Sequence, residues 1–347
     1  MFSPDGTHLL FVSDADNLVP NDANGRGDIV LHDLATASTS LVSLNAAGTT
    51  SADDVSGEPR FDPTGTKIAF FSRATDLTGT EDANFTFDVL VRDLSRGATT
   101  LLSINEDGTG TGDAWSLAPM FNFDGTKVAF QSSASDLEVR DTNFADDVFV
   151  SNLTTGTTEV VSLDVAGTNA GDHESYGPVF SPTSDQLAFT SLASNLVATD
   201  DNNTRDVFVR DLGTGTTTVA SVDTTDGRVG NAESGGFDFS PDGALIAFQS
   251  FASNLVPQDT NGRRDLFVRD LNLGTTTLVS ARGRGMGSAN DESASPAWGR
   301  PSFDPRGGRV AFVSLASDLG NTDTNDSADV YVVTLRPAVV GQLVRLR

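Results

Sequence analysis

The stretch Phe239-Ser-Pro-Asp-Gly243, followed by the apolar triplet Ile246-Ala-Phe248, decides the fold of this chain because it recurs. Variants begin at six phenylalanines, with steps of 59, 60, 59, 59 and 64 residues: Phe2, Phe61, Phe121, Phe180, Phe239 and Phe303. A fixed period of this size is typical of repeat architectures. A functional device inside one repeat is therefore expected in several copies.

The fifth repeat shows most clearly what one unit contains. Phe239 ends a short strand, and the Pro-Asp-Gly sequence after it favours a tight turn, because Pro fixes φ and Gly accepts positive φ. Residues 245–250, 265–271 and 275–280 are apolar or β-branched runs of strand length. We name the four strands of a repeat a to d in chain order. Helical periodicity is absent.

Six units of four short strands predict an all-β fold, a six-bladed β-propeller of antiparallel blades. A ring suits such sheets because each buries its two faces against its neighbours. We expect one propeller over residues 1–336. Met1 stands directly before the first motif, so the first blade is expected to lack its inner strand. Residues 337–347 form a tail that could supply the outer strand of the last blade.

The motif resembles the PD40, or TolB-type, propeller repeat, a WD40-like family. The resemblance covers nearly the whole chain, and the third copy departs from it with Phe123 where Pro is expected. Related blades occur in periplasmic scaffolds, in peptidase gating domains and in some polysaccharide-active enzymes. The resemblance therefore implies the fold and an extracellular or periplasmic location. The copies that carry it are Phe2-Ser-Pro-Asp-Gly6, Phe61-Asp-Pro-Thr-Gly65, Phe180-Ser-Pro182, Phe239-Ser-Pro-Asp-Gly243 and Phe303-Asp-Pro-Arg-Gly307.

Composition excludes several classes of function. The net charge of −26 repels nucleic acid and anionic membranes, and no apolar run approaches the length of a membrane span. The absence of cysteine excludes disulfides and thiolate sites. The three histidines stand at unrelated repeat positions, which argues against a multi-histidine metal site.

The loops between strands b and c, here called the Asp loops, all carry Asp-x-Asn-x-x-x-Asp. Oxygen ligands at positions 1 and 3, followed by a later carboxylate, resemble the spacing used by hard cations, and Ca²⁺ takes six to eight oxygens. The sequence therefore predicts structural Ca²⁺ sites. Their residues are Asp22, Asn24, Asp28, Asp82, Asn84, Asp88, Asp141, Asn143, Asp147, Asp200, Asn202, Asp206, Asp259, Asn261, Asp265, Asp323, Asn325 and Asp329.

A simpler interpretation of the Asp loops stays open beside the cation sites. Asp and Asn commonly form Asx turns, and a duplicated turn also repeats. The charge density favours a cation, because windows 14–28, 73–88, 133–147, 192–206, 251–265 and 315–329 hold 22 acidic residues against six arginines. Such crowding costs folding free energy unless cations or Arg pairs screen it.

The loops from strand d to strand a of the next repeat, here called the crossing loops, carry Asp/Asn-x-x-Ser. Antiparallel order places them on the same face as the Asp loops. Because the pattern repeats evenly, we interpret it as local hydrogen bonding. Residues that break the repeat symmetry are better binding candidates, although packing at the channel entrance is the favoured interpretation for Trp115 and Trp298. The candidates of this kind are Trp115, His173, Tyr176 and Trp298. Glu174, Glu233 and Glu292, which precede the Ser in three copies of the pattern, are binding candidates as well.

These observations favour a non-catalytic binding or scaffold module that presents one acidic rim to a protein, peptide or glycan. The alternative is a glycan-active hydrolase or lyase with its site at the channel mouth. No carboxylate pair stands apart from the repeating ones, and no Gly-x-Ser-x-Gly nucleophile elbow occurs. We expect a monomer or a structural module of a larger surface protein.

Overall fold

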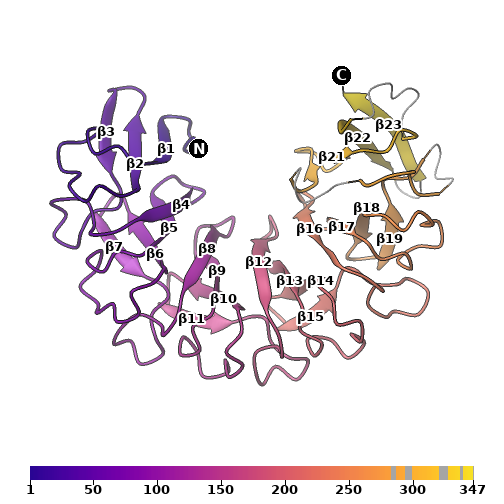
Figure 1. Ribbon diagram of the computed structural model, residues 1–347, viewed down its shortest axis with the longest axis horizontal. Helices are drawn as coiled ribbons and strands as arrows, with labels where there is room; N and C mark the ends of the chain where they lie inside the picture. The colour runs from indigo at the N-terminus through magenta and orange to yellow at the C-terminus, as the bar shows by residue number, and fades with distance from the viewer. Residues whose placement is uncertain (283–286, 294–298, 320–326, 337–338, 347) are drawn as a thin grey trace. The chain divides into compact units, whose positions relative to one another are not determined.

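The computed structural model describes residues 1–282, 287–293, 299–319, 327–336 and 339–346. Every regular element in these ranges is a β-strand (Figure 1). None of these ranges contains a helix of the length and apolarity needed to cross a membrane. The chain divides into two compact units, Met1–Phe180 and Ser181–Arg347.

The strands of the first unit follow the predicted order of a to d. They are β1 (His8–Ser13), β2 (Asp28–Asp33), β3 (Ser38–Leu41), β4 (Ser56–Phe61), β5 (Lys67–Ser72), β6 (Asp88–Asp93), β7 (Ala98–Leu101), β8 (Ser116–Phe121), β9 (Lys127–Ser132), β10 (Asp147–Asn152), β11 (Thr157–Val160) and β12 (Ser175–Phe180).

The strands of the second unit continue this pattern. They are β13 (Gln186–Ser191), β14 (Asp206–Asp211), β15 (Thr216–Val219), β16 (Ser234–Phe239), β17 (Leu245–Ser250), β18 (Asp265–Asp270), β19 (Thr275–Leu278), β20 (Ser302–Phe303), β21 (Arg309–Ser314), β22 (Asp329–Arg336) and β23 (Val339–Leu346). The three later strands of the fifth repeat lie where the sequence predicts them.

Across the described residues these strands form six antiparallel sheets, each with its strands in chain order. The first sheet has three strands, and Phe2 forms an isolated bridge to Leu9 at the place of its missing inner strand. The other sheets have four. Residues 339–346 of the tail form β23, which pairs with β22 at the edge of the last sheet.

The turn between strands a and b explains the recurring Pro-Asp-Gly sequence. In the fifth repeat, the backbone N–H of Gly243 donates to the carbonyl of Ser240 at 2.8 Å, and Gly243 has a φ of +70°. The Asp242 carboxylate accepts hydrogen bonds from the Ser240 hydroxyl and the Ala244 N–H. The motif is therefore a self-contained turn.

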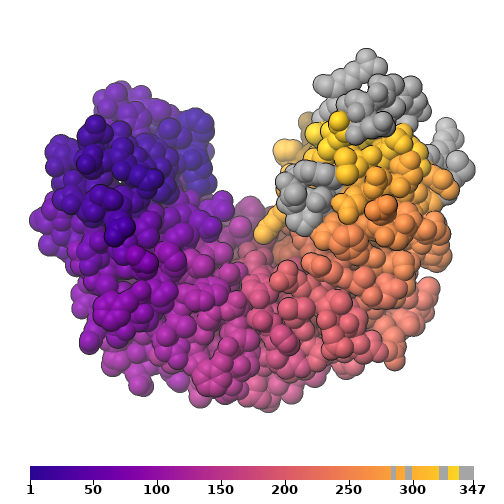
Figure 2. Space-filling view, in the orientation of Figure 1, coloured from indigo at the N-terminus to yellow at the C-terminus, as the bar shows by residue number. Residues whose placement is uncertain are grey.

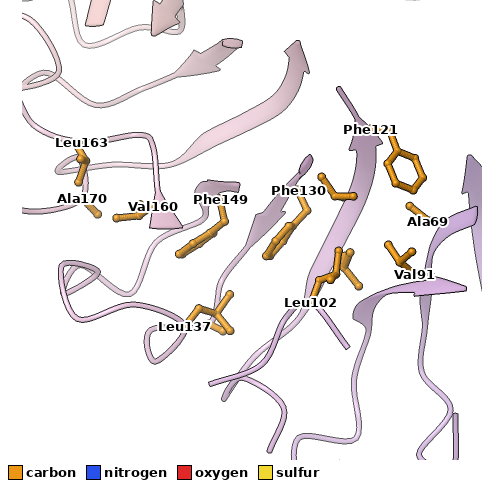
Figure 3. Close-up of a cluster of buried hydrophobic side chains, with 13 residues drawn as sticks. Ala69, Val91, Leu102, Phe121, Phe130, Leu137, Phe149, Val160, Leu163 and Ala170 are labelled. Atoms are coloured by element: carbon orange, nitrogen blue, oxygen red, sulfur yellow. The ribbon is translucent and has the colours of Figure 1, made fainter. Parts of the chain in front are cut away.

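Successive sheets of the first unit pack through strands b and c, whose apolar residues are buried on both faces. Phe130 on β9 and Phe149 on β10 stack with ring centroids 5.7 Å apart, and both are fully buried (Figure 3). Val91 and Ala69 of the preceding sheet belong to the same cluster. The first unit, indigo to magenta in Figure 2, forms a continuous surface over these sheets. Rigid sheets of this kind hold the long loops in place.

Candidate functional site

Each described Asp loop closes around its asparagine. In the first loop, Asn24 Oδ1 accepts the backbone N–H of Arg26 at 2.7 Å, and Asn24 Nδ2 donates to the carbonyl of Ala52 at 2.7 Å. The amide oxygen thus forms an Asx turn, while the amide nitrogen ties the Asp loop to the crossing loop that leads to the next sheet. The same two contacts recur at Asn84, Asn143, Asn202 and Asn261. Asp323 and Asn325 lie outside the described residues.

The last acid of each of the first five motifs is buried at the start of strand c. Ser103 Oγ donates to Asp88 Oδ1 at 2.7 Å, and the same Oγ accepts the backbone N–H of Val89 at 3.0 Å. One oxygen of each of these carboxylates is therefore held by a serine at the end of strand d. The equivalent pairs are Asp28 with Ser43, Asp147 with Ser162, Asp206 with Ser221, and Asp265 with Ser280.

Several carboxylate oxygens in the Asp loops are buried and accept no hydrogen bond. Asp141 and Asp88 each expose only 4% of their surface, and Oδ2 of each lacks a partner. A buried polar atom in this state costs folding free energy. A bound cation or a proton would relieve that cost. Oxygens of the same kind occur on Asp22, Asp259 and Asp265.

The carboxylates of one motif also act on each other electrostatically. Burial raises the pKa of Asp88 to about 7, and the negative charge of Asp82 in the same loop adds to this shift. Burial likewise raises the pKa of Asp206 to about 8, with Asp200 contributing in the same direction. Burial raises the pKa of Asp141 to about 6. The folded loops therefore favour added positive charge near neutral pH.

Among the described residues, no group of three or more Asp, Glu, His or Cys side chains is arranged to hold a metal ion, so the first and last acids of a loop would act as a pair. A hard cation between the first and last acids would complete its six to eight oxygens with backbone carbonyls and water. Each asparagine oxygen accepts one hydrogen bond in its turn and keeps a second lone pair, so the asparagines stay predicted ligands beside the carboxylates.

The crossing loops are held by reciprocal hydrogen bonds. The backbone N–H of Asp53 donates to Asp76 Oδ1 at 2.9 Å, while Asp53 accepts both the N–H and the hydroxyl of Thr75. The Ser56 hydroxyl then bonds that of Ser72 at 2.9 Å in the buried part of the sheet. Similar contacts join Asp113 with Ser135 and Asp136, Asn231 with Ser253 and Asn254, and Asn290 with Ser317 and Asp318. The Asp/Asn-x-x-Ser pattern thus supplies local hydrogen bonds that hold each crossing loop against the beginning of the next Asp loop.

The aromatic and histidine candidates of the first unit lie at the starts of strands a. Trp115 is half-buried just before β8, and its carbonyl accepts the N–H of Ser133. His173 is exposed and pairs through Nδ1 with Glu174 Oε2. Tyr176 is half-buried on β12. Trp298 lies outside the described residues.

In the second unit, the charges of Glu233 and Glu292 both act on Arg264, an arginine that the sequence analysis did not single out. The Arg264 guanidinium lies 4.3 Å from the centroid of the Phe251 ring. Burial lowers the pKa of Arg264, while the charges of Glu233 and Glu292 act in the opposite direction. Glu233 also lies 4.0 Å from Arg205. In the sequence, both arginines directly precede the last Asp of their motifs, and this position is the signal that could have pointed to them.

No protein-family model matches the chain, and no curated protein matches its sequence. Solved structures share its fold. Oligogalacturonate lyase from Vibrio parahaemolyticus is 13% identical with a TM-score of 0.54, over 96% of this chain and 73% of the lyase. The β-propeller domain of the Trilobed protease from Pyrococcus furiosus is 13% identical with a TM-score of 0.50, over 94% of this chain and 79% of that domain.

TolB from Acinetobacter baumannii is 18% identical with a TM-score of 0.45, and the match covers 95% of this chain. The chain spans 61% of the TolB chain. The six antiparallel sheets, with the propeller domain of the Trilobed protease as a structural neighbour, define a β-propeller fold, as the resemblance to the PD40 repeat implies.

Proposed function

We propose that this chain is a non-catalytic β-propeller binding module whose Asp loops bind divalent cations, with Ca²⁺ the best fit. The six sheets would be the blades of one six-bladed propeller. The cations would hold the Asp loops in shape, and the face formed by the Asp loops and crossing loops would meet a protein, peptide or glycan partner. The module would act as a monomer or as part of a larger chain.

The observation that carries this proposal is the set of buried carboxylate oxygens without hydrogen-bond partners at Asp22, Asp88, Asp141, Asp259 and Asp265. All five residues are the first or last acid of an Asp loop. A turn accounts for the asparagine, whose amide oxygen and nitrogen both form hydrogen bonds. It does not account for buried carboxylate oxygens without partners, whereas a cation site does.

Calcium fits this donor set better than other common cations. The donors are hard oxygens, which excludes a preference for soft metals. Mg²⁺ demands a near-ideal octahedron, whereas Ca²⁺ accepts irregular sets that include carbonyls and water. Two carboxylates per site suggest an affinity in the range of extracellular modules, about 10⁻⁴ to 10⁻³ M. Such sites would fill in an extracellular or periplasmic setting.

Thermal unfolding in EDTA, and then with Ca²⁺ or Mg²⁺ at 0.1–10 mM, tests the proposal. A ligand that binds the native state raises its stability by mass action, by about 2.7 kcal/mol per site at one hundred times Kd. We expect the melting temperature to rise by several degrees in Ca²⁺ and less in Mg²⁺. Equal melting temperatures in EDTA and in 10 mM Ca²⁺ would rule the cation sites out.

The cluster of Glu233, Glu292 and Arg264 supports the alternative of a glycan-active hydrolase or lyase. An arginine between two carboxylates can orient a uronate group while one acid moves a proton. Incubation with polygalacturonate, followed by absorbance of unsaturated products and a reducing-end assay, tests this alternative. Turnover that is lost in Glu233→Gln or Glu292→Gln would replace the non-catalytic proposal.

A further inference from the structure

A pocket of about 280 Å³ opens on the first unit beside the second Asp loop. Its lining residues are Asp53, Asp54, Arg73, Thr75 and Phe85. Small-molecule sites usually have volumes of about 300–1,000 Å³. This pocket therefore suits one small ring and is too small to enclose a longer ligand.

Phe85 stands at this pocket in an unusual backbone conformation. Its φ is +54°, and 72% of its surface is exposed. Two other repeats have glycine at this position, Gly25 and Gly262, and both also have positive φ. A bulky residue is rarely found there, and strain of this kind concentrates at functional sites. The phenyl ring of Phe85 is therefore exposed to solvent beside the polar side chains of the pocket.

The polar wall of the pocket is the ion pair of Arg73 and Asp54. Arg73 Nε and Nη2 donate to Asp54 Oδ2 at 3.0 and 2.8 Å. Partial burial acts to raise the pKa of Asp54. The hydrogen bonds from the Val55 N–H and Arg73, together with the charges of Arg73 and Arg26, outweigh burial, so the pKa of Asp54 lies below its usual value. Arginine has five N–H donors, and Asp54 accepts two. The pair keeps donors and acceptors available to a ligand.

This combination is not a by-product of the repeat. Phe144 also has positive φ, at +58°, and 82% of its surface is exposed. In that repeat, however, Ala114 and Ser133 stand where the pocket has Asp54 and Arg73. The later described repeats have His173 with Leu192, Ala232 with Phe251, and Asp291 with Leu315 at the same two positions. Only the first crossing loop joins an acid, an arginine and a phenylalanine among the copies that the structure describes.

The charges of the pocket favour a neutral ligand. Asp53 and Asp54 carry two negative charges, and Arg73 and Arg26 offset them, with Arg26 Nε 3.9 Å from Asp54 Oδ1. The chain as a whole has a net charge of −26, so it repels anions at longer range. An aromatic face beside planar hydrogen-bonding groups suits a ring with one apolar face and hydroxyls at its edge.

We propose that this pocket binds one neutral hexopyranose unit of a glycan. Phe85 stacks on the apolar face of the sugar, and Arg73 and Asp54 hydrogen-bond its hydroxyls. This inference names the partner of the proposed binding module, and it rests on that proposal only in treating the loop face as a binding surface.

Saturation-transfer NMR and calorimetry with methyl glucoside, methyl galactoside, methyl mannoside and galacturonate test the pocket. We expect at least one neutral glycoside to bind in the millimolar range and galacturonate to bind at least fivefold more weakly. Phe85→Gly should weaken binding at least tenfold without lowering the melting temperature, because glycine accepts positive φ. Arg73→Lys should also weaken sugar binding, because lysine has one nitrogen and cannot replace the two that Arg73 directs at Asp54.

Phe144→Gly is the matched control, since it makes the same backbone change where Ala114 and Ser133 replace the acid and arginine. It should bind the glycoside as the unchanged protein does. Absence of binding by all three neutral glycosides, tighter binding of galacturonate, displacement of the sugar by short peptides, or equal losses in both glycine variants would overturn the proposal.

Each titration is repeated in EDTA and in Ca²⁺, with thermal unfolding measured on the same samples. Sugar binding without a Ca²⁺-induced shift would refute the cation sites alone. A Ca²⁺-induced shift without sugar binding would refute the pocket alone.

Discussion

The buried carboxylates of Asp141 and Asp147 lie close enough within one Asp loop for the charge of Asp141 to raise the pKa of Asp147. Burial is the larger cause, and together they raise that pKa to about 7. Repulsion between two ionised groups in one loop destabilises the fold unless a positive charge lies between them.

Replacing Asp141 with Asn should separate repulsion from cation binding. Without cations the variant should be as stable as the parent or up to about 1 kcal/mol more stable, because one buried charge is removed. Its Ca²⁺-induced rise in melting temperature should be smaller, because one site has lost a carboxylate ligand. Asp107→Asn, which changes an exposed acid outside the Asp loops, serves as the control. A full Ca²⁺ response in Asp141→Asn would contradict the assignment of this ligand.

Stability should depend on pH with opposite trends in the two conditions. In EDTA, the folded protein holds protons on Asp88, Asp147, Asp206 and Asp265, whose pKa values are about 7 to 8, whereas the unfolded chain releases them near pH 4. The free energy of unfolding should therefore fall as pH rises from 5 to 8. The gain from Ca²⁺ should grow over the same range because the cation displaces these protons. Melting curves at pH 5, 6.5 and 8 check both trends, and a Ca²⁺ gain that is independent of pH would argue against them.

Asn202→Ala should destabilise the second unit. The variant loses the turn bond to the Thr204 N–H and the bonds that Asn202 Nδ2 donates to Asp206 and to the Gly230 carbonyl. At about 0.5–1.5 kcal/mol per bond, we expect a loss of about 2–3 kcal/mol, measured by urea unfolding. Asn203→Gly is the control, since Asn203 is exposed and already has positive φ. If both variants lost the same free energy of unfolding, the hydrogen bond from Asn202 to the Gly230 carbonyl would contribute little.

Phe144→Gly should leave stability unchanged or raise it slightly. The left-handed conformation costs a non-glycine residue about 1–2 kcal/mol, and glycine regains part of this while losing more backbone entropy on folding. A melting temperature within about 3 °C above that of the parent is expected by calorimetry. A clear fall would show that the exposed ring makes contacts that stabilise the fold.

The sequence predicted the strands well because the strand signals are local. The run from Leu245 to Ser250 is β17, and the acid that opens each strand c is visible in the Asp-x-Asn-x-x-x-Asp spacing. The shared face of the Asp loops and crossing loops followed from antiparallel order. The Asp/Asn-x-x-Ser pattern of the crossing loops was also interpreted correctly as local hydrogen bonding.

The roles of individual side chains in the Asp loops were not visible in the sequence. The spacing predicts Asn24 as a metal ligand, and this stays a prediction. Its amide is oriented by a hydrogen bond to the carbonyl of Ala52, 28 residues away, which no local pattern indicates. Glu233 and Glu292 looked like members of a repeat. Only packing between neighbouring sheets shows that both lie near Arg264, and only the fold assembles the pocket at Phe85.

The link from Asn24 to the carbonyl of Ala52 always has the same direction in later copies, from one sheet to the segment that starts the next. Opening one sheet therefore also loosens the beginning of its neighbour. Unfolding along the array should spread between adjacent repeats like a one-dimensional chain of coupled units. Amide protons of adjacent sheets such as β4–β7 and β8–β11 should then exchange with solvent at correlated rates.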